Sequence, residues 1–225
     1  MPGRKSKHSI NYWTKGIRSV DVGAKLRLVP YWEKGSSKSD RIEVVIDPGP
    51  SFGAGDHPTT IMALELLEVA ISAVKDANDP ATVLDVGTGT GVLAIAGVAL
   101  GASFAVGLDV DPAAVFVARR NVALNSASNL MPEGTNSSIH MFVGESEAVK
   151  GCFNIVVANL AAPTLLNVLE SIVAAAKPFV ILSGIADAMA EEVVRSYSAA
   201  GLRPIESRQC DGWNAVLFKK SGITE

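Results

Sequence analysis

Asp85-Val86-Gly87-Thr88-Gly89-Thr90-Gly91 lies between a run of β-branched residues and a run with the composition of a helix. Glycines in such a strand-turn-helix connection allow a tight turn, and they let a ligand approach the backbone and the N-terminus of the helix. Because nucleotide-binding α/β folds place their ligands at such turns, the stretch predicts a small-molecule site. The alternative is that the glycines form a simple tight turn.

Short β-branched runs alternate with longer helical patterns around this loop, which is typical of βα units with parallel strands. We expect strands at 82–86, 104–108, 139–143, 154–158 and 179–183, and helices at 58–73, 92–100, 112–125, 163–176 and 187–200. Two extended runs, 203–208 and 213–219, flank a turn and predict a terminal hairpin. The predicted fold is α/β and Rossmann-like, with a mostly parallel sheet and an antiparallel C-terminal hairpin.

Residues 1–46 have a different character. They carry few apolar anchors and several basic side chains, namely Arg4, Lys5, Lys7, Lys15 and Arg18. We expect a mobile arm here rather than a dedicated nucleic-acid contact. Residues 25–29 and 42–46 are short enough to pair as a small hairpin. We therefore divide the chain into an N-terminal arm with a small extended segment, 1–46, and a domain that carries the site, 47–225.

An acidic residue after the glycine loop narrows the choice of cofactor. Asp109 ends the strand that follows, where a carboxylate accepts both hydroxyl hydrogens of a ribose diol. A dinucleotide fingerprint needs a small residue where Val92 stands, so NAD is disfavoured. S-adenosylmethionine has no phosphate to cradle, and Asp85 is placed to orient the loop and its water near the ammonium group of that ligand. The alternative for Asp85 is a carboxylate that only stabilises the turn.

Composition excludes several classes of protein. The chain has 225 residues, 48% hydrophobic and 19% charged, so it is too apolar for intrinsic disorder. Its net charge of -3 has the wrong sign for a protein that coats nucleic acid through its overall field. The two cysteines, Cys152 and Cys210, lack the spacing of a zinc site or a disulfide framework, so we expect no metal and a reducing cytoplasm.

The apolar stretch 86–108 has the length of a membrane span, but its glycines break it into strand, turn and helix. In a secretory signal an apolar segment follows the basic residues. The basic residues at this N-terminus are not followed by such a segment. We therefore expect a soluble, cytoplasmic protein without a membrane partner.

Residues 47–60 read Asp-Pro-Gly-Pro-Ser-Phe-Gly-Ala-Gly-Asp-His-Pro-Thr-Thr. This stretch resembles the D-P-G-x-A-F-G-T-G-x-H-x-T-T signature of the bacterial ribosomal-protein lysine methyltransferases, the PrmA family. The resemblance continues through 85–91, 107–112, 157–160, 182–185 and 212–215, about the last four-fifths of the chain. It implies that residues 47–225 form a class I S-adenosylmethionine-dependent methyltransferase domain.

The resemblance also implies a set of cofactor contacts. Gly87 and Gly89 would face the methionine end, Asp109 the ribose, and Val110 one face of the adenine. Asn159 would lie beside the transferable methyl group. The implied cofactor-binding residues are Phe52, Gly53, Thr59, Asp85, Gly87, Gly89, Asp109, Val110, Asn159 and Leu160.

Structural alternatives exist for the segment before the first long helix. Phe52 would supply an apolar contact to the ligand or serve as a core anchor, and Thr59 would donate a hydrogen bond to it or stand in the first helical turn. For His57 we favour the structural role, as the N-cap before Pro58 at the first helical position.

Methyl transfer from a sulfonium is an in-line displacement that needs its partners held in line. A lysine or α-amine acceptor must first lose a proton, and burial lowers the pKa of such an amine. We expect Asn159 to be the catalytic residue, because its side-chain carbonyl at a strand end accepts a hydrogen bond from the amine. The alternative is that Asn159 only ties the loop to the next helix.

Three departures from the family pattern bear on the substrate: Ala54 replaces a threonine, Asp56 precedes His57, and Met189 stands where a glutamine is common. The residues before Asp47 are too few and too polar to build the family's separate recognition domain. We expect an enzyme that N-methylates lysine or α-amine groups of a protein, as the ribosomal-protein methyltransferases do. The alternatives are a small-molecule methyltransferase and a non-catalytic cofactor-binding module.

Overall fold

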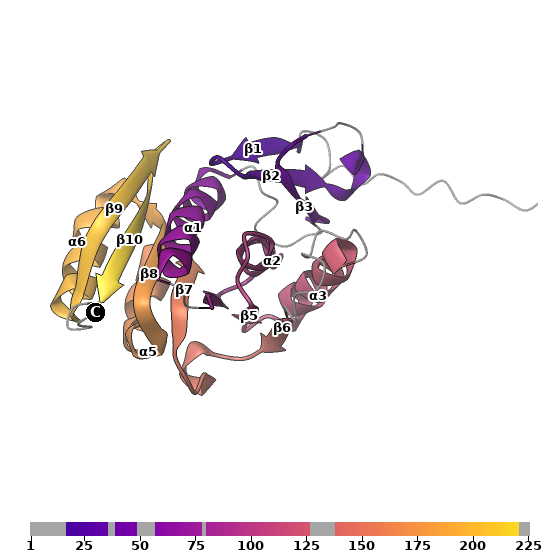
Figure 1. Cartoon of the computed structure of the whole chain (residues 1–225). Helices are drawn as coiled ribbons and strands as arrows, with labels where there is room; N and C mark the ends of the chain where they lie inside the picture. The colour runs from indigo at the N-terminus through magenta and orange to yellow at the C-terminus, as the bar shows by residue number, and fades with distance from the viewer. Residues whose placement is uncertain (1–16, 36–38, 49–56, 78–79, 127–137, 221–225) are drawn as a thin grey trace, which may run out of the picture.

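The computed structural model describes residues 17–35, 39–48, 57–77, 80–126 and 138–220. Its centre is a seven-stranded sheet in the order β6-β5-β4-β7-β8-β10-β9 (Figure 1). The strands are β4 (Thr82–Val86), β5 (Phe104–Asp109), β6 (Ser138–Val143), β7 (Phe153–Asn159), β8 (Ala176–Ala186), β9 (Leu202–Cys210) and β10 (Trp213–Lys220). The first five in this spatial order are parallel, while β10 is antiparallel to both β8 and β9. This confirms the predicted fold class and its terminal hairpin.

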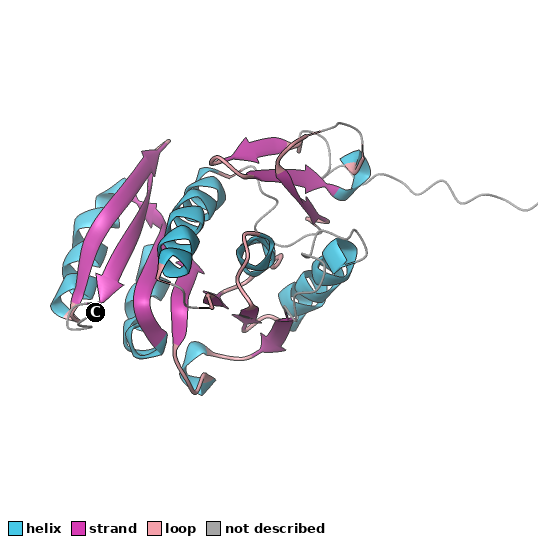
Figure 2. Cartoon of the chain, viewed as in Figure 1, coloured by secondary structure: helices cyan, strands magenta, loops and turns pink. Residues whose placement is uncertain are grey.

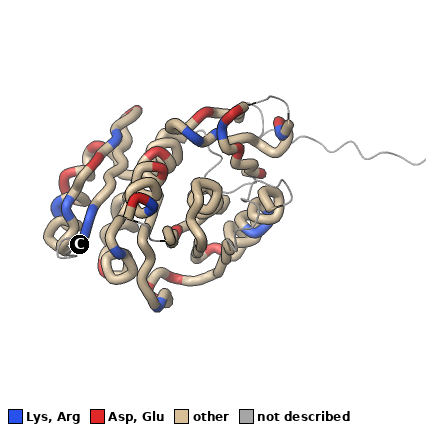
Figure 3. The backbone as a smooth tube through the Cα atoms, in the orientation of Figure 1, with Lys and Arg blue, Asp and Glu red and all other residues tan. Residues whose placement is uncertain are grey.

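Helices cover both faces of the sheet (Figure 2). On one face lie α1 (Pro58–Asp76), α2 (Val92–Ala99) and α3 (Pro112–Ser126), and on the other α4 (Ala162–Asn167), α5 (Leu169–Ala175) and α6 (Asp187–Ala199). Two buried apolar clusters, one for each face, hold these layers together. All residues of α2 are buried, and Figure 3 shows this helix without a charged residue. Its apolarity therefore serves the core, and no helix of the described residues could cross a membrane.

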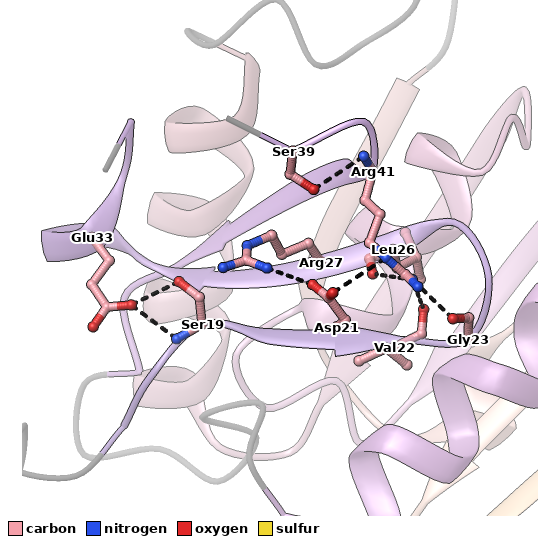
Figure 4. A network of polar contacts seen from close by, with 9 residues as sticks. All are labelled: Ser19, Asp21, Val22, Gly23, Leu26, Arg27, Glu33, Ser39 and Arg41. Atoms are coloured by element: carbon pink, nitrogen blue, oxygen red, sulfur yellow. Dashed lines mark hydrogen bonds and ion pairs between the residues drawn. The ribbon is translucent and has the colours of Figure 1, made fainter. Parts of the chain in front are cut away.

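A second, smaller sheet precedes the main one. It contains β1 (Val20–Val22), β2 (Leu26–Pro30) and β3 (Ile42–Ile46) in that spatial order, with a 3-10 turn, η2 (Tyr31–Glu33), after β2. Asp21 of β1 makes ion pairs with Arg27 and Arg41 across the outer surface of this sheet (Figure 4). The buried apolar residues of the sheet join the core formed by α1 and α2. The small sheet thus shares a core with the main one.

The predicted hairpin of 25–29 with 42–46 is wrong in direction. The two strands are neighbours, as expected, but they pair in parallel, with Leu26 opposite Ile42. The antiparallel partner of β2 is β1, and the two strands are joined by a tight turn at Gly23, where φ is +55°. Because β1 occupies one edge of β2 in this way, β3 is left to pair along the other edge. Of the N-terminal segment predicted at 1–46 as an arm and a small extended part, residues 1–16 lie outside the described residues.

The helix predicted at 163–176 is divided in two. Val168 has φ -96° and ψ 11°, ends α4 and precedes α5. Its carbonyl accepts the backbone amide of Ile172 and the hydroxyl of Ser171, which restarts the helical pattern. A short 3-10 turn, η3 (Ser146–Ala148), lies between β6 and β7 and contacts α5. The other predicted strands and helices occur within a few residues of their expected ends.

Candidate active site

A cavity of about 690 Å³ opens at the carboxyl ends of the central strands. It is bounded by the loop after β4, the ends of β5, β7 and β8, the start of α1 and the start of β10. The lining residues are His57, Thr59, Thr60, Gly87, Thr88, Gly89, Val92, Leu93, Asp109, Asp111, Ala113, Ala114, Asn159, Leu160, Ala161, Gly184 and Trp213. The volume lies within the range of small-molecule sites, and the carboxyl edge of a parallel sheet is where open α/β folds bind ligands.

Asp85 is the penultimate residue of β4, just before the glycine loop, and is fully buried. Its Oδ2 accepts the hydroxyl of Thr88 at 2.7 Å and the backbone amide of Ala94 at 3.2 Å. Burial raises the pKa of Asp85 to about 7, against the opposing effect of these two hydrogen bonds. Its Oδ1 has no hydrogen-bond partner among the described residues. Asp85 therefore fixes the loop against α2 while keeping one buried oxygen unused.

Asp109 links the end of β5 to the glycine loop. Its Oδ2 accepts the backbone amide of Gly89 at 3.0 Å, and its Oδ1 accepts that of Asp111 at 3.0 Å. The loop itself is tied to the same strand, since Gly87 and Thr88 both donate backbone amides to the carbonyl of Leu108. A carboxylate thus lies on the cavity wall next to a glycine amide, as a site for a ribose diol requires.

Asn159, at the end of β7, presents an amide to the cavity. Its Nδ2 donates to the hydroxyl of Thr60 at 3.4 Å, which orients the side chain. Its buried Oδ1 has no partner within the part of the chain that the structure describes. A Cβ added to Gly184 on the adjacent strand would lie 3.1 Å from this Oδ1. The site therefore holds an oriented carbonyl oxygen that is ready to accept a hydrogen bond.

The start of α1 forms another wall. His57 is the N-cap and accepts the backbone amide of Thr59, which confirms the structural role expected for this histidine. The hydroxyl of Ser183 holds the carbonyl of Thr59 at 2.8 Å. Trp213, from the start of β10, packs its ring edge-to-face with His57. The C-terminal hairpin thus contributes an aromatic side chain to the cavity.

The structure brings most of the predicted residues together. Thr59, Gly87, Gly89, Asp109, Asn159 and Leu160 line the cavity, and Asp85 lies buried under the loop. Val110 is 68% exposed and lies outside this lining, so its predicted contact with adenine stays a prediction. Phe52 and Gly53 lie outside the described residues.

Sequence reasoning missed several lining residues, above all Thr60 and Trp213. Both lie within stretches that carried the family resemblance, 47–60 and 212–215, so the signal was present. The family motif ends in two adjacent threonines, and the predicted ligand contact belongs to Thr59 alone, so Thr60 is not among the predicted site residues. No periodicity or spacing indicates that a tryptophan at the far end of the chain lines the same cavity as the glycine loop.

The described residues fit S-adenosylmethionine. The unpartnered Oδ1 of Asn159 is an acceptor at a residue of the cavity lining, which suits a ligand with a cationic end. At Gly87, where φ is +74°, a Cβ would collide with the side chain of Leu160, so only glycine lets the loop pass this close to Leu160. Gly87, Gly89 and Asp109 would hold the cofactor, with Asn159 next to its reacting end.

Solved structures of similar architecture define the class. Magnesium protoporphyrin IX methyltransferase from Synechocystis PCC 6803 with bound SAM aligns with a TM-score of 0.56 at 12% identity, covering 85% of this chain and 90% of that one. Ribosomal protein L11 methylase from Lactobacillus delbrueckii subsp. bulgaricus aligns with a TM-score of 0.74 at 25% identity, covering 91% of this chain and 98% of that one. The fold and its cavity are those of a class I methyltransferase, which uses S-adenosylmethionine as cofactor.

Sequence comparison gives the family. The model of the family described as "Ribosomal protein L11 methyltransferase (PrmA)" matches residues 5–221, and the chain belongs to this family. The ribosomal protein L11 methyltransferase of Geotalea uraniireducens is 36% identical over 223 residues, 96% of this chain and 68% of the relative. The ribosomal protein L11 methyltransferase of Myxococcus xanthus is 36% identical over 210 residues, which cover 93% of this chain and 68% of the relative. The chain thus spans about two thirds of the length of these relatives.

Proposed function

We propose that this chain methylates amine nitrogens of a protein, with ribosomal protein L11 as the acceptor. The observation that carries the proposal is the Oδ1 of Asn159, a residue of the cavity lining: this oxygen is buried and has no hydrogen-bond partner among the described residues. The amine that receives the methyl group needs a neighbouring group that accepts a hydrogen bond from its N–H, and this oxygen can do so. The acceptor protein is inferred from the names of the relatives.

The residues of this chain act by positioning and by excluding water. When bound, S-adenosylmethionine would supply a methyl group on a sulfonium, and this methyl would pass to an in-line nucleophile as the C–S bond breaks and the sulfur leaves as a neutral thioether. A lysine amine has a pKa near 10.4 in water, and the apolar walls formed by Leu160, Ala161 and Trp213 favour its neutral form. Asn159 accepts an N–H of that amine and aims its lone pair. Thr60 keeps the amide of Asn159 in the required orientation.

The test is transfer of labelled methyl groups from S-adenosylmethionine to purified ribosomal protein L11, with an Asn159→Ala variant beside the parent chain. We expect label in the L11 protein and a loss of turnover of about 100-fold in the variant, with unchanged affinity for S-adenosylhomocysteine by calorimetry. An unchanged rate would remove Asn159 from the mechanism.

An extract of the source cells distinguishes the alternatives. Label found only in the small-molecule fraction would overturn the protein acceptor. Label in no fraction, with cofactor binding intact, would overturn catalysis itself and favour a binding module.

A further inference from the structure

Two buried asparagines on α3 contact the small N-terminal sheet. Asn121 and Asn125 are 0% and 1% exposed, and their four-residue spacing puts both side chains on one face of the helix. That face meets β3, which lies beside α3 in Figure 1. Buried amides are retained where their hydrogen bonds are satisfied, so their partners indicate what these residues do.

The two amides pair with the free edge of β3 as a neighbouring strand would. The Oδ1 of Asn125 accepts the backbone amide of Val45 at 2.9 Å, and its Nδ2 donates to the carbonyl of Val45 at 2.7 Å. Asn121 makes the same pair of hydrogen bonds with Asp47. Its Oδ1 accepts the backbone amide of Asp47 at 2.8 Å, and its Nδ2 donates to the carbonyl of Asp47 at 3.1 Å. Val45 and Asp47 are two residues apart, so they present their backbone groups on the same edge.

The asparagines differ in one contact. The Nδ2 of Asn125 also donates to the carbonyl of Asn121, within its own helix, at 2.8 Å. The Nδ2 of Asn121 instead reaches the carbonyl of Thr90 at 2.9 Å. Thr90 is in the glycine loop, directly after Gly89, whose amide is held by Asp109. One buried amide therefore joins the cofactor loop to the backbone of Asp47.

Asp47 is held from a second side as well. Its carboxylate makes an ion pair with Arg120 at 3.0 Å, so consecutive residues of α3 bind its backbone and its side chain. This fixes the end of β3 relative to α3, and the bond from Asn121 to Thr90 extends the same connection to the glycine loop. Loss of Asn121 would remove this hydrogen bond from the carbonyl of the buried Thr90 and so weaken the attachment of the loop to α3.

We infer that Asn121 is a positioning residue for the cofactor site. It acts through the backbone of Thr90, which sets the path of the loop from Gly87 to Gly91, and it anchors that loop to β3. Asn125 anchors β3 alone. Since the position of the loop affects cofactor binding, binding of the cofactor in turn stabilises the attachment of β3 to α3 and the loop.

The experiment compares Asn121→Leu with Asn125→Leu. Each variant removes one pair of hydrogen bonds to β3 and substitutes a side chain of similar size, so both should lose a similar amount of stability against denaturant. The affinity for S-adenosylhomocysteine, measured by calorimetry, should separate them. We expect the Kd to rise about tenfold in Asn121→Leu and to stay within about twofold in Asn125→Leu. Equal shifts in the two variants, or none in either, would overturn the inference.

A second pair of variants provides an independent readout of the loop. Asn121→Asp keeps the acceptor for the amide of Asp47 but loses the donor to Thr90, and Asn125→Asp is its control. Hydrogen exchange of the Gly91 amide, which bonds to the carbonyl of Thr88, reports on the loop directly. Faster exchange at Gly91 in Asn121→Asp alone supports positioning. The same exchange rate in both variants contradicts it.

Discussion

Trp213 and His57 lie against each other at the rim of the cavity, with ring centroids 5.5 Å apart and planes at 68°. One begins the last strand of the sheet, and the other caps the first long helix. Edge-to-face contact between aromatic rings is favourable and directional. The pair therefore connects the C-terminal hairpin to the start of α1 and closes one side of the site.

Replacement of Trp213 should affect the acceptor more than the cofactor. In Trp213→Leu, the contact with His57 is lost and the cavity widens beside Asn159, so we expect turnover on ribosomal protein L11 to fall about tenfold. Trp213→Phe keeps an aromatic ring and should retain most of the rate. Methyl-transfer rates and calorimetry with S-adenosylhomocysteine measure the two effects separately. Equal rates in the two variants would show that the ring has no part in positioning.

Gly184 and Gly212 form a matched pair for a test of crowding at the site. Their φ angles are +82° and +81°, so alanine suffers the same backbone strain at both. A Cβ at Gly184 would lie 2.5 Å from the carbonyl oxygen of Leu160, whereas at Gly212 nothing lies within 4 Å. We expect Gly184→Ala to lose about 2 kcal/mol more stability than Gly212→Ala, because the backbone of Leu160 must move. Denaturant unfolding of the two variants measures this, and equal losses would contradict it.

Asp109 should control affinity for the cofactor. Asp109→Ala removes the proposed ribose acceptor and leaves the amide of Gly89 without its partner, so the Kd for S-adenosylhomocysteine should rise about 100-fold. Asp109→Asn keeps one oxygen for Gly89 and should show a smaller rise. Calorimetry on both variants distinguishes loss of the loop contact from loss of the charge. Unaltered affinity in Asp109→Ala would reject the ribose assignment.

The sequence predicted the main sheet because its strands and helices obey local rules. The strand before Asp85 is bounded as expected, and Pro58 and Pro112 begin their helices at the predicted residues. The site residues that followed from this pattern, such as Asp109 and Asn159, stand at strand ends where a parallel sheet gathers them.

Other features depend on contacts between distant parts of the chain. The direction of β3 is one, because its free edge is paired by side chains of α3, 74 and 80 residues further on. Neither Asn121 nor Asn125 belongs to a motif that indicates this role. Trp213 is another, since only the antiparallel pairing of β10 with β8, where Trp213 stands opposite Ala186, carries it to the cavity. Periodicity describes single elements and does not encode such pairings.

Asp85 makes the stability of the protein depend on pH in a direction unusual for a carboxyl group. Desolvation raises its pKa from 3.8 to about 7, and the charge of Asp109 adds to the rise, while hydrogen bonds from Thr88 and Ala94 oppose it. The folded state therefore binds the proton more tightly than the unfolded state does. The tighter proton binding stabilises the folded state. This stabilisation is fully present below the pKa that Asp85 has in the unfolded chain, and it is lost as pH rises through the pKa that it has in the folded protein.

The isosteric variant Asp85→Asn lacks this titration, so its stability relative to the parent chain should increase between about pH 4 and pH 8, by an amount on the order of 4 kcal/mol. Titrating groups that do not interact with Asp85 are common to the two proteins and cancel in the comparison. Denaturant unfolding of both proteins at several pH values gives the difference directly. A constant difference across this range would mean that Asp85 is ionised throughout, with its buried charge compensated by the hydrogen bonds from Thr88 and Ala94.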